Sequence, residues 1–212
     1  MEDARLYIER TAPAVEGLFK LLNQYDWQKM DALVTLMKSK TRSELDANKQ
    51  NFSSNDIARE VIAGSILQIA YVAFASYAKP QVKSDNALHF ESEINRLIRE
   101  NPNRARQKGK FSLPMQFCVG RDIGDLPLGV IVFAGRNQYN HFYENKRLCV
   151  INELVFNHLH AMWPAPENGL SFDLMPGKLF SYSVLAALGW LDESNSLGYE
   201  VYTRDLSYAL HI

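Results

Sequence analysis

Hydrophobic residues along this chain recur mostly at spacings of three and four, which is the pattern of helices that bury one face. The clearest case is residues 56–78, which follow Ser53, Ser54 and Asn55, residue types that often cap helices, and end two residues before Pro80. We therefore predict a helix over residues 56–78. Its apolar positions are Ile57, Val61, Ile62, Leu67, Ile69, Val72 and Phe74.

This helix also contains an uncharged stretch, residues 61–78, that reaches the roughly 18 residues needed to cross a membrane. Small and polar residues, among them Gly64, Ser65 and Gln68, make the stretch only weakly apolar. We therefore interpret it as a core helix and expect no membrane association. Because small residues let a neighbouring helix approach closely, the helix belongs at the centre of the core or at the seam of a dimer.

Five further segments show helical patterns, and few segments look extended. The predicted helices cover residues 2–23, 25–40, 84–100, 145–162 and 178–191. Pro13 falls inside the first, so that helix begins after the proline or bends at it. The candidate strands are residues 111–119 and 198–202, and linkers are expected near residues 41–53, 101–110 and 164–176. The predicted fold class is all-α, a mostly helical bundle.

The composition is that of a folded globular protein. The chain has 212 residues, 47% of them hydrophobic and 22% charged, which excludes disordered, collagen-like and disulfide-scaffold classes. We predict a single helical domain over residues 1–212. Two cysteines, Cys118 and Cys149, are too few for a disulfide framework, and the first residues lack the layout of a secretion signal. We therefore expect a reduced, cytoplasmic protein.

The formal net charge of −1 conceals an uneven distribution of charge. Residues 101–121 contain five basic residues and no acid, whereas residues 167–212 contain six acids and two bases. The basic residues are Arg104, Arg106, Lys108, Lys110 and Arg121. Such a basic loop either contacts a phosphate backbone, as in RNA, or is a solvated connection between helices.

The sequence lacks the motifs of several common nucleotide-binding, metal-binding and hydrolase sites. It contains no phosphate-binding glycine loop, no dinucleotide fingerprint and no HExxH, CxxC or GxSxG motif. Asp122 and Asp125 are typical of turns, and His158 and His160, two apart on a predicted helix, point in different directions and cannot share a metal. We expect neither a metal nor a cofactor.

One group of polar residues remains as a candidate site. Arg136, Asn137 and His141 follow directly after a mostly apolar run, so they would stand at the end of a buried element. Histidine can move a proton to or from a 2′-hydroxyl or a leaving 5′-oxygen. Arginine can bind a phosphate and stabilise its transition state, and asparagine can support either group. These types together are suited to RNA cleavage without a metal, because RNA supplies its own nucleophile.

The segment from Arg136 to His141, RNQYNH, resembles the Rx4-6H motif of HEPN domains, a family of nucleotide-binding domains of higher eukaryotes and prokaryotes. The similarity covers residues 117–159, including the lead-in FCVGRDIGDLPLGVIVFAG, and extends faintly to residues 55–78. It implies a HEPN-like helical bundle with extra elements at both ends. The core would span about residues 54–163, with N-terminal helices over residues 2–50 and a C-terminal extension over residues 164–212.

The resemblance also implies an activity. Many members are metal-independent endoribonucleases that dimerise and act in toxin–antitoxin, phage-defence and CRISPR systems. Carried over by position, Arg136 and His141 would be the catalytic pair and Asn137 the supporting polar residue. The basic loop would guide RNA to a cleft formed by a homodimer.

One subgroup of toxins extends the motif to Rx4-6HxY, with a tyrosine that a partner nucleotidyltransferase modifies. His141, Phe142 and Tyr143 fit that extension, so Tyr143 is a candidate modification site and an antitoxin a candidate partner. Those toxins are typically much shorter than this chain. Two other hypotheses stay open: a non-catalytic module that binds nucleotide or RNA, and an interaction protein that dimerises through residues 56–78.

Overall fold

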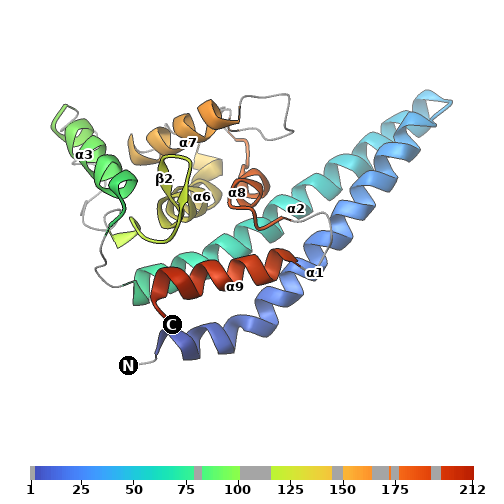
Figure 1. Ribbon diagram of the computed structural model, residues 1–212. Helices are drawn as coiled ribbons and strands as arrows, with labels where there is room; N and C mark the ends of the chain where they lie inside the picture. The colour runs from blue at the N-terminus through green and yellow to red at the C-terminus, as the bar shows by residue number, and fades with distance from the viewer. Residues whose placement is uncertain are drawn as a thin grey trace.

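The computed structural model describes residues 3–78, 83–100, 116–144, 150–163, 172, 177–191 and 197–212, and these are almost entirely helical (Figure 1). The helices are α1 (Ala4–Met37), α2 (Arg42–Tyr77), α3 (Asp85–Glu100), α6 (Leu128–His141), the 3-10 helix η1 (Phe142–Glu144), α7 (Val150–Met162), α8 (Ser181–Ala187) and α9 (Leu197–Leu210). Within the described ranges the only strands are β1 (Asp122–Ile123) and β2 (Leu126–Pro127), an antiparallel pair that turns at Gly124, where φ is +56°. The predicted all-α fold class is confirmed.

The two longest helices, α1 and α2, run side by side as a hairpin that projects beyond the other helices (Figure 1). α2 begins at Arg42 because Thr41 and Glu44 form a capping box: Thr41 Oγ1 accepts from the Glu44 N–H at 3.2 Å, and Glu44 Oε2 accepts from the Thr41 N–H at 3.2 Å. The linker predicted over residues 41–53 and the helix start after Asn55 are therefore wrong.

The helices predicted over residues 2–23 and 25–40 are a single helix, α1. Pro13 lies inside it and lacks the N–H that would bond to the Glu9 carbonyl. The alternative that the helix begins after Pro13 is wrong. Figure 1 shows that the N-terminal part of α1 is curved relative to the rest of the helix.

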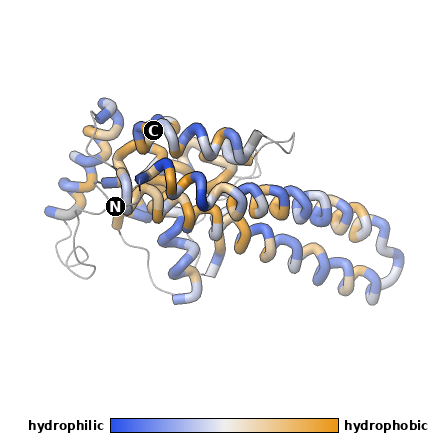
Figure 2. Tube along the Cα trace, turned by 90° about the horizontal axis from the view of Figure 1, so that it is seen from below, coloured by the Kyte–Doolittle hydropathy of each residue, from blue (hydrophilic) through white to orange (hydrophobic). Residues whose placement is uncertain are grey.

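The hydrophobic core lies where α2, α6, α7, α8 and α9 meet, away from the projecting end of the hairpin. We call residues 23–61 the arm and the remainder the body. Throughout the arm, which is described completely, Ala32 is the only buried hydrophobic residue. Figure 2 shows hydrophobic residues concentrated in the body and interrupted by hydrophilic ones along the arm.

Glycines allow α2 and α6 to approach closely in the body. A Cβ at Gly64 would overlap the ring of Tyr139, and a Cβ at Gly135 would lie 2.9 Å from Val184 Cγ1 and 3.1 Å from Leu67 Cδ1. The small residues at this point of α2 therefore pack against α6 of the same chain. This places α2 at the centre of the core, and the surface at Gly64 is not available to a second copy.

One stretch of α2 has the length and hydropathy of a membrane span. Half of that stretch is buried inside the protein, as in the core helix of a soluble protein. It includes much of the segment for which the sequence predicted a core helix.

The C-terminal segment differs from the strand predicted over residues 198–202, because these residues belong to α9. The short segment GYEVY over residues 198–202 is rich in residue types that favour strands. Tyr202, Leu206 and Ala209, however, are buried at spacings of four and three, and the rings of Tyr199 and Tyr202 pack on Phe19 of α1. The helical period therefore prevails over the short alternation.

The other predicted elements are partly visible. α3 matches the prediction for residues 84–100, α7 covers residues 150–162 of the predicted 145–162, and α8 is shorter than the predicted 178–191. Of the strand predicted over residues 111–119, residues 111–115 lie outside the described ranges. Phe117 and Val119 are joined by a tight turn, with the Val119 N–H 2.8 Å from the Phe117 carbonyl, and belong to no strand.

Candidate functional site

α6 positions the Arg136, Asn137 and His141 side chains at the end of a rigid helix. Residues 128–135 are all buried, Arg136 and Asn137 are partly buried, and His141 is exposed at the last residue. The buried amide of Gln138 fastens this end: its nitrogen donates to the Lys178 carbonyl, and its oxygen accepts from the Phe180 N–H at 3.3 Å. The sequence thus correctly predicts a buried element that ends in polar residues, and the structure shows that this element is a helix.

The guanidinium of Arg136 is directed toward α2. Its Nε donates to Gln68 Oε1 at 2.9 Å, its Nη1 donates to Asn137 Oδ1 at 3.1 Å, and its Cζ lies 4.4 Å from the centroid of the Tyr71 ring. With its amide oxygen toward the guanidinium, Asn140 accepts from Nε at 2.9 Å and Nη2 at 3.1 Å. These contacts hold the cation in a fixed orientation at the junction of α2 and α6.

His141 faces a carboxylate that the sequence reasoning did not include. Its Nδ1 lies 2.5 Å from Glu144 Oε1, and the side chain is 47% exposed. A carboxylate on Nδ1 fixes the imidazole so that Nε2 points away from it, as a proton-transferring histidine requires. The signal was present in the sequence, since Glu144 follows His141 by three residues, a spacing that places two residues on one side of a helical turn.

Within one chain the described contacts do not join Arg136 to His141. Five residues along a helix correspond to a rotation of roughly 140°, so the two side chains leave α6 in different directions. Arg136 contacts Gln68 and Tyr71 on α2, whereas His141 contacts Glu144 in η1. Asn137 lies with Arg136.

Two aromatic residues stand beside His141. Phe142 is 37% exposed and Tyr143 is 71% exposed, and their rings pack edge to face with centroids 5.9 Å apart. Tyr143, the candidate for modification, is therefore accessible at the surface. Such rings also offer a surface on which an RNA base can stack.

The candidate RNA-binding residues fall into two groups. Arg104, Arg106, Lys108 and Lys110 lie outside the described residues. Arg121 is described, and its guanidinium pairs within the body: its Nε and Nη2 donate to Asp205 Oδ1 and Oδ2 at 2.9 and 3.0 Å, and Nη2 also donates to the Leu188 carbonyl at 2.7 Å. Asp205 is 3% exposed and accepts in addition from Trp190 Nε1 at 2.9 Å. Arg121 thus ties α9 to the residue that follows α8 and to the segment before β1.

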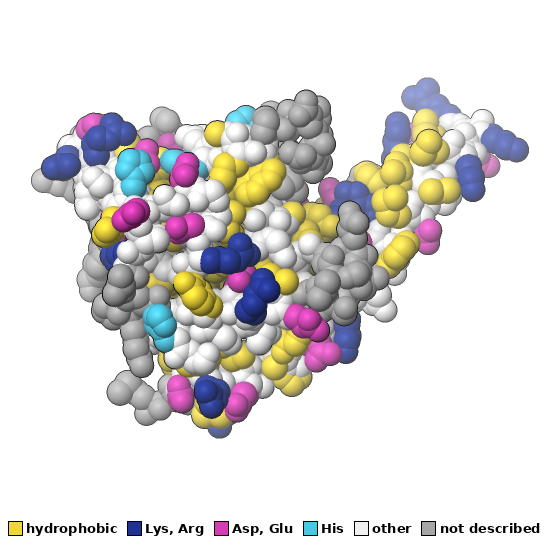
Figure 3. Space-filling view, in the orientation of Figure 1, with side chains coloured by type: hydrophobic (Ala, Val, Ile, Leu, Met, Phe, Trp, Pro, Cys, Tyr) yellow, Lys and Arg dark blue, Asp and Glu magenta, His cyan; other side chains and the backbone are white. Residues whose placement is uncertain are grey.

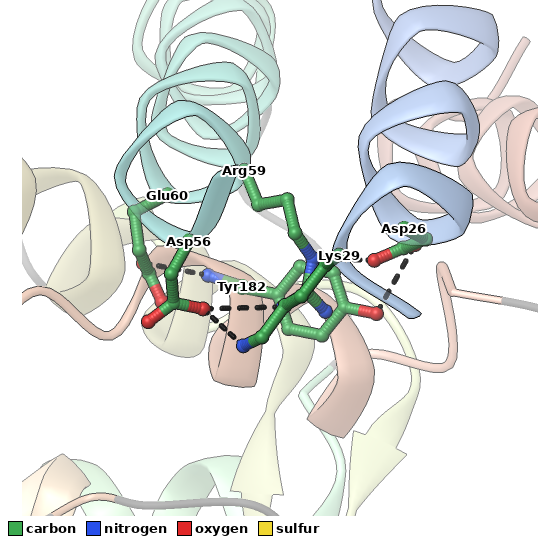
Figure 4. A network of polar contacts seen from close by, with 6 residues as sticks. All are labelled: Asp26, Lys29, Asp56, Arg59, Glu60 and Tyr182. Carbon is green, nitrogen blue, oxygen red and sulfur yellow. Dashed lines mark hydrogen bonds and ion pairs between the residues drawn. The ribbon is translucent and has the colours of Figure 1, made fainter. Parts of the chain in front are cut away.

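A second polar cluster, which the sequence reasoning missed, joins the base of the arm to α8 (Figure 4). Its members are Asp26 and Lys29 on α1, Asp56, Arg59 and Glu60 on α2, and Tyr182 on α8. Arg59 is at its centre, with a side chain only 10% exposed. Its Nε donates to Asp26, its Nη1 donates to Asp56 Oδ1 at 3.2 Å, and its Cζ lies 3.7 Å from the centroid of the Tyr182 ring.

Tyr182 holds the same cluster from the other side. Its hydroxyl donates to Asp26 Oδ2 at 3.2 Å and its N–H donates to Glu60 Oε2 at 3.1 Å. Burial raises the pKa of the Glu60 carboxyl, although the hydrogen bond from the Tyr182 N–H opposes the shift. Burial also raises the pKa of the Tyr182 hydroxyl, and the positive charge of Arg59 opposes this. The cluster pairs its charges internally, which suits a structural tie between arm and body.

The described residues offer no metal centre, since no three His, Cys, Asp or Glu side chains among them gather closely enough to hold an ion. His158 contacts Glu93 of α3, with Nε2 3.3 Å from Oε2, and packs edge to face on Phe90. Burial raises the pKa of the Cys118 thiol to about 11, so this cysteine is a poor nucleophile at neutral pH.

Comparison of the chain with models of protein families, with curated proteins and with solved structures finds no match in any of the three. Support for a function therefore comes from the chain's own residues. The most specific arrangement is His141 against Glu144 at the exposed end of α6, with Arg136 one to two turns earlier.

Proposed function

We propose that this protein is a metal-independent endoribonuclease of the HEPN type. The observation that supports the proposal most directly is the pairing of His141 Nδ1 with Glu144 at 2.5 Å, on a half-exposed imidazole at the end of a buried helix. A histidine oriented by a carboxylate is suited to take a proton from one oxygen and to deliver it to another. RNA cleavage by its own 2′-hydroxyl requires these two transfers.

In the proposed reaction the 2′-oxygen attacks the adjacent phosphorus and the bond from phosphorus to the 5′-oxygen breaks. His141 moves a proton at the 2′-hydroxyl or at the leaving oxygen. The products are a 2′,3′-cyclic phosphate and a 5′-hydroxyl. The proposed reaction uses no metal ion and no nucleophile other than the 2′-hydroxyl of the RNA.

Arg136 is proposed to bind the scissile phosphate. A guanidinium has five N–H donors, and the bonds to Gln68, Asn137 and Asn140 engage three of them, which leaves two for a phosphate. Because Arg136 and His141 leave α6 in different directions, the proposal includes a homodimer whose two copies complete the cleft. A toxin or phage-defence role, with an antitoxin that acts on Tyr143, is the biological context that the motif implies.

The test is cleavage of single-stranded RNA by the purified protein in EDTA. We expect His141→Ala and Arg136→Ala to lower the rate by about 100-fold or more, the usual contribution of a proton-transferring or transition-state-stabilising group. Glu144→Gln should lower it by about 10-fold or more, because the orienting charge is lost. His160→Ala is the matched control, since His160 is an exposed histidine on α7. Cleavage that persists in His141→Ala, or that disappears on chelation, contradicts the mechanism.

RNA binding is tested separately through the basic loop. Reversal of Arg104, Arg106, Lys108 and Lys110 to glutamate should weaken RNA binding and flatten its dependence on salt. With fewer cations in contact with the phosphates, binding releases fewer counterions from the RNA. An unchanged affinity and salt slope would show that the loop is only a connection. Expression in a bacterial host offers a rapid companion test: growth inhibition that His141→Ala relieves.

A non-catalytic RNA- or nucleotide-binding module is the second candidate. The observation that favours it is the engagement of Arg136 with Gln68 and Tyr71, which is typical of an arginine that packs two helices together. This candidate predicts RNA binding without cleavage, and Arg136→Ala would then lower stability more than it lowers RNA affinity.

A further inference from the structure

Gln68 is a polar side chain on the part of α2 that crosses the core, and it contacts the candidate site. It follows Gly64, where α2 and α6 approach closely, and its Oε1 accepts from Arg136 Nε at 2.9 Å. Tyr71, three residues further along α2, lies on the same side of the helix, with its ring centroid 4.4 Å from Arg136 Cζ. Phe117 stacks on this ring, with centroids 5.0 Å apart. α2 therefore supplies both a hydrogen-bond acceptor and a supported aromatic face to the guanidinium.

The described partners of the Arg136 guanidinium are all uncharged. They are the Tyr71 ring, Gln68 Oε1, Asn137 Oδ1 and the amide oxygen of Asn140. No carboxylate among the residues that the structure describes forms an ion pair with this arginine. The amide oxygens engage three N–H groups without neutralising the positive charge. One N–H on Nη1 and one on Nη2 remain, and a guanidinium commonly binds phosphate through two donors.

Other cations of the described chain are either paired or fully hydrated. Arg59 and Arg121, the other described arginines that are at least partly buried, both pair with aspartates. On the face that Figure 3 shows, Lys and Arg side chains gather toward the tip of the arm, where they extend into water. Arg136 belongs to neither group, because it is partly buried and its described partners are neutral. A cation in such a place is stabilised when an anion binds to it.

We propose that Gln68 is a positioning residue of a phosphate site: its neutral amide directs the Arg136 guanidinium and leaves the positive charge available to a phosphate of RNA. The inference rests on the proposed function, in which Arg136 binds the scissile phosphate. A carboxylate at position 68 could hold the guanidinium in the same place, but it would neutralise the charge. The side chain at this position is therefore required to be uncharged as well as to accept a hydrogen bond.

This role predicts that Gln68→Glu weakens RNA binding without destabilising the protein. Glutamate has nearly the same shape as glutamine, and its ion pair with Arg136 should keep Tm equal to or above that of the wild-type protein. The same ion pair competes with an RNA phosphate, so the Kd for RNA should rise by about 10-fold or more. If Gln68 only joined α2 to α6, strengthening its bond to Arg136 would not lower the affinity for RNA.

Affinity is measured by fluorescence anisotropy on a single-stranded RNA with 2′-fluoro groups throughout, which lacks the nucleophile of the proposed reaction. Each phosphate contact with a single strand contributes about 0.7 to the slope of log affinity against log salt, so Gln68→Glu should flatten the slope by about 0.7. Gln28→Glu is the matched control, because it adds the same charge at an exposed position on the arm. Its Kd should stay within about 2-fold of the wild-type value.

Gln68→Leu separates orientation from charge. Leucine removes the acceptor but adds no charge, so the Kd should rise by about 3-fold or more while the salt slope stays near that of the wild-type protein. An unchanged Kd in this variant would overturn the positioning role of Gln68.

For Gln68→Glu, a wild-type Kd and salt slope would overturn the inference, and so would a Tm that falls together with the affinity. An equal loss of affinity in Gln28→Glu would also overturn it. The binding assay does not depend on cleavage. If Gln68→Glu weakens binding but the wild-type protein does not cut RNA, the inference stands and the ribonuclease proposal fails. If the wild-type protein cuts RNA and Gln68→Glu binds and cuts it equally well, the ribonuclease proposal stands and the inference fails.

Discussion

Replacement of Arg59 by methionine should destabilise the protein by about 3 kcal/mol. Arg59 is 10% exposed and pairs with Asp26 and Asp56, which are 31% and 49% exposed. Removing one partner of a fully buried pair costs roughly 3–5 kcal/mol, and the partial exposure of the two aspartates reduces this to about 2 kcal/mol. Loss of the guanidinium from the face of the Tyr182 ring adds about 0.5–1 kcal/mol.

The assay is thermal unfolding followed by circular dichroism, with urea unfolding as a second measure. For a chain of this length 1 kcal/mol corresponds to roughly 2–4 °C, so Arg59→Met should lower Tm by about 6–12 °C. Arg42→Met is the matched control, because Arg42 is exposed at the start of α2, and its effect should stay within about 0.5 kcal/mol. Tyr182→Phe keeps the ring against Arg59 but removes the hydroxyl that contacts Asp26 and Arg59, and it should cost about 1 kcal/mol. Equal stability of Arg59→Met and Arg42→Met would refute the structural role of the cluster.

Three further predictions concern the base of the arm and the body. Glu60→Gln should stabilise the protein at pH 7 but not below pH 4.5. The pKa of the Glu60 carboxyl is raised in the folded state, so its charged form destabilises the fold as pH rises. Urea unfolding at both pH values measures this effect, and an equal gain in stability at both would contradict the prediction. Arg121→Ala should cost about 2–3 kcal/mol in urea unfolding by leaving buried Asp205 unpaired, and Asp205→Asn in the same chain should recover part of the loss. Gly64→Ala should destabilise by about 1–3 kcal/mol in spite of the higher helix propensity of alanine, because its Cβ meets the Tyr139 ring; a gain in Tm would show that the two helices can separate at no cost.

The sequence predicts α3 well, because its apolar pattern is reinforced by packing, and it predicts that residues 128–135 of α6 form a buried element. It fails in the arm for a physical reason. Residues 41–53 are polar and look like a linker, yet the capping box of Thr41 and Glu44 starts a helix there and α1 lies alongside. Polar helices that pair through charges show only weak hydrophobic periodicity. The sequence pattern alone therefore could not show that α1 and α2 are each one continuous helix.

The sequence also predicts part of the candidate site. A polar group at the end of a buried element follows from the order of residues in α6, and Glu144 could have been found from its spacing to His141. The cluster around Arg59 could not, because Asp26, Arg59 and Tyr182 come from three segments far apart in the chain. The same holds for Arg121, whose partner Asp205 is 84 residues away. From the sequence alone, Arg121 beside a basic loop resembles an RNA contact, because its pairing with Asp205 is visible only in the folded chain.

The most direct test of the central proposal is to identify the ends of RNA fragments made in EDTA by the wild-type protein and by His141→Ala. Mass spectrometry of the fragments distinguishes a 2′,3′-cyclic phosphate from a 3′-hydroxyl. We predict 2′,3′-cyclic phosphate and 5′-hydroxyl ends with the wild-type protein, and a rate lower by about 100-fold or more with His141→Ala. Intact RNA with the wild-type protein, fragments that end in 3′-hydroxyl groups, or equal cleavage by His141→Ala would contradict the proposed function.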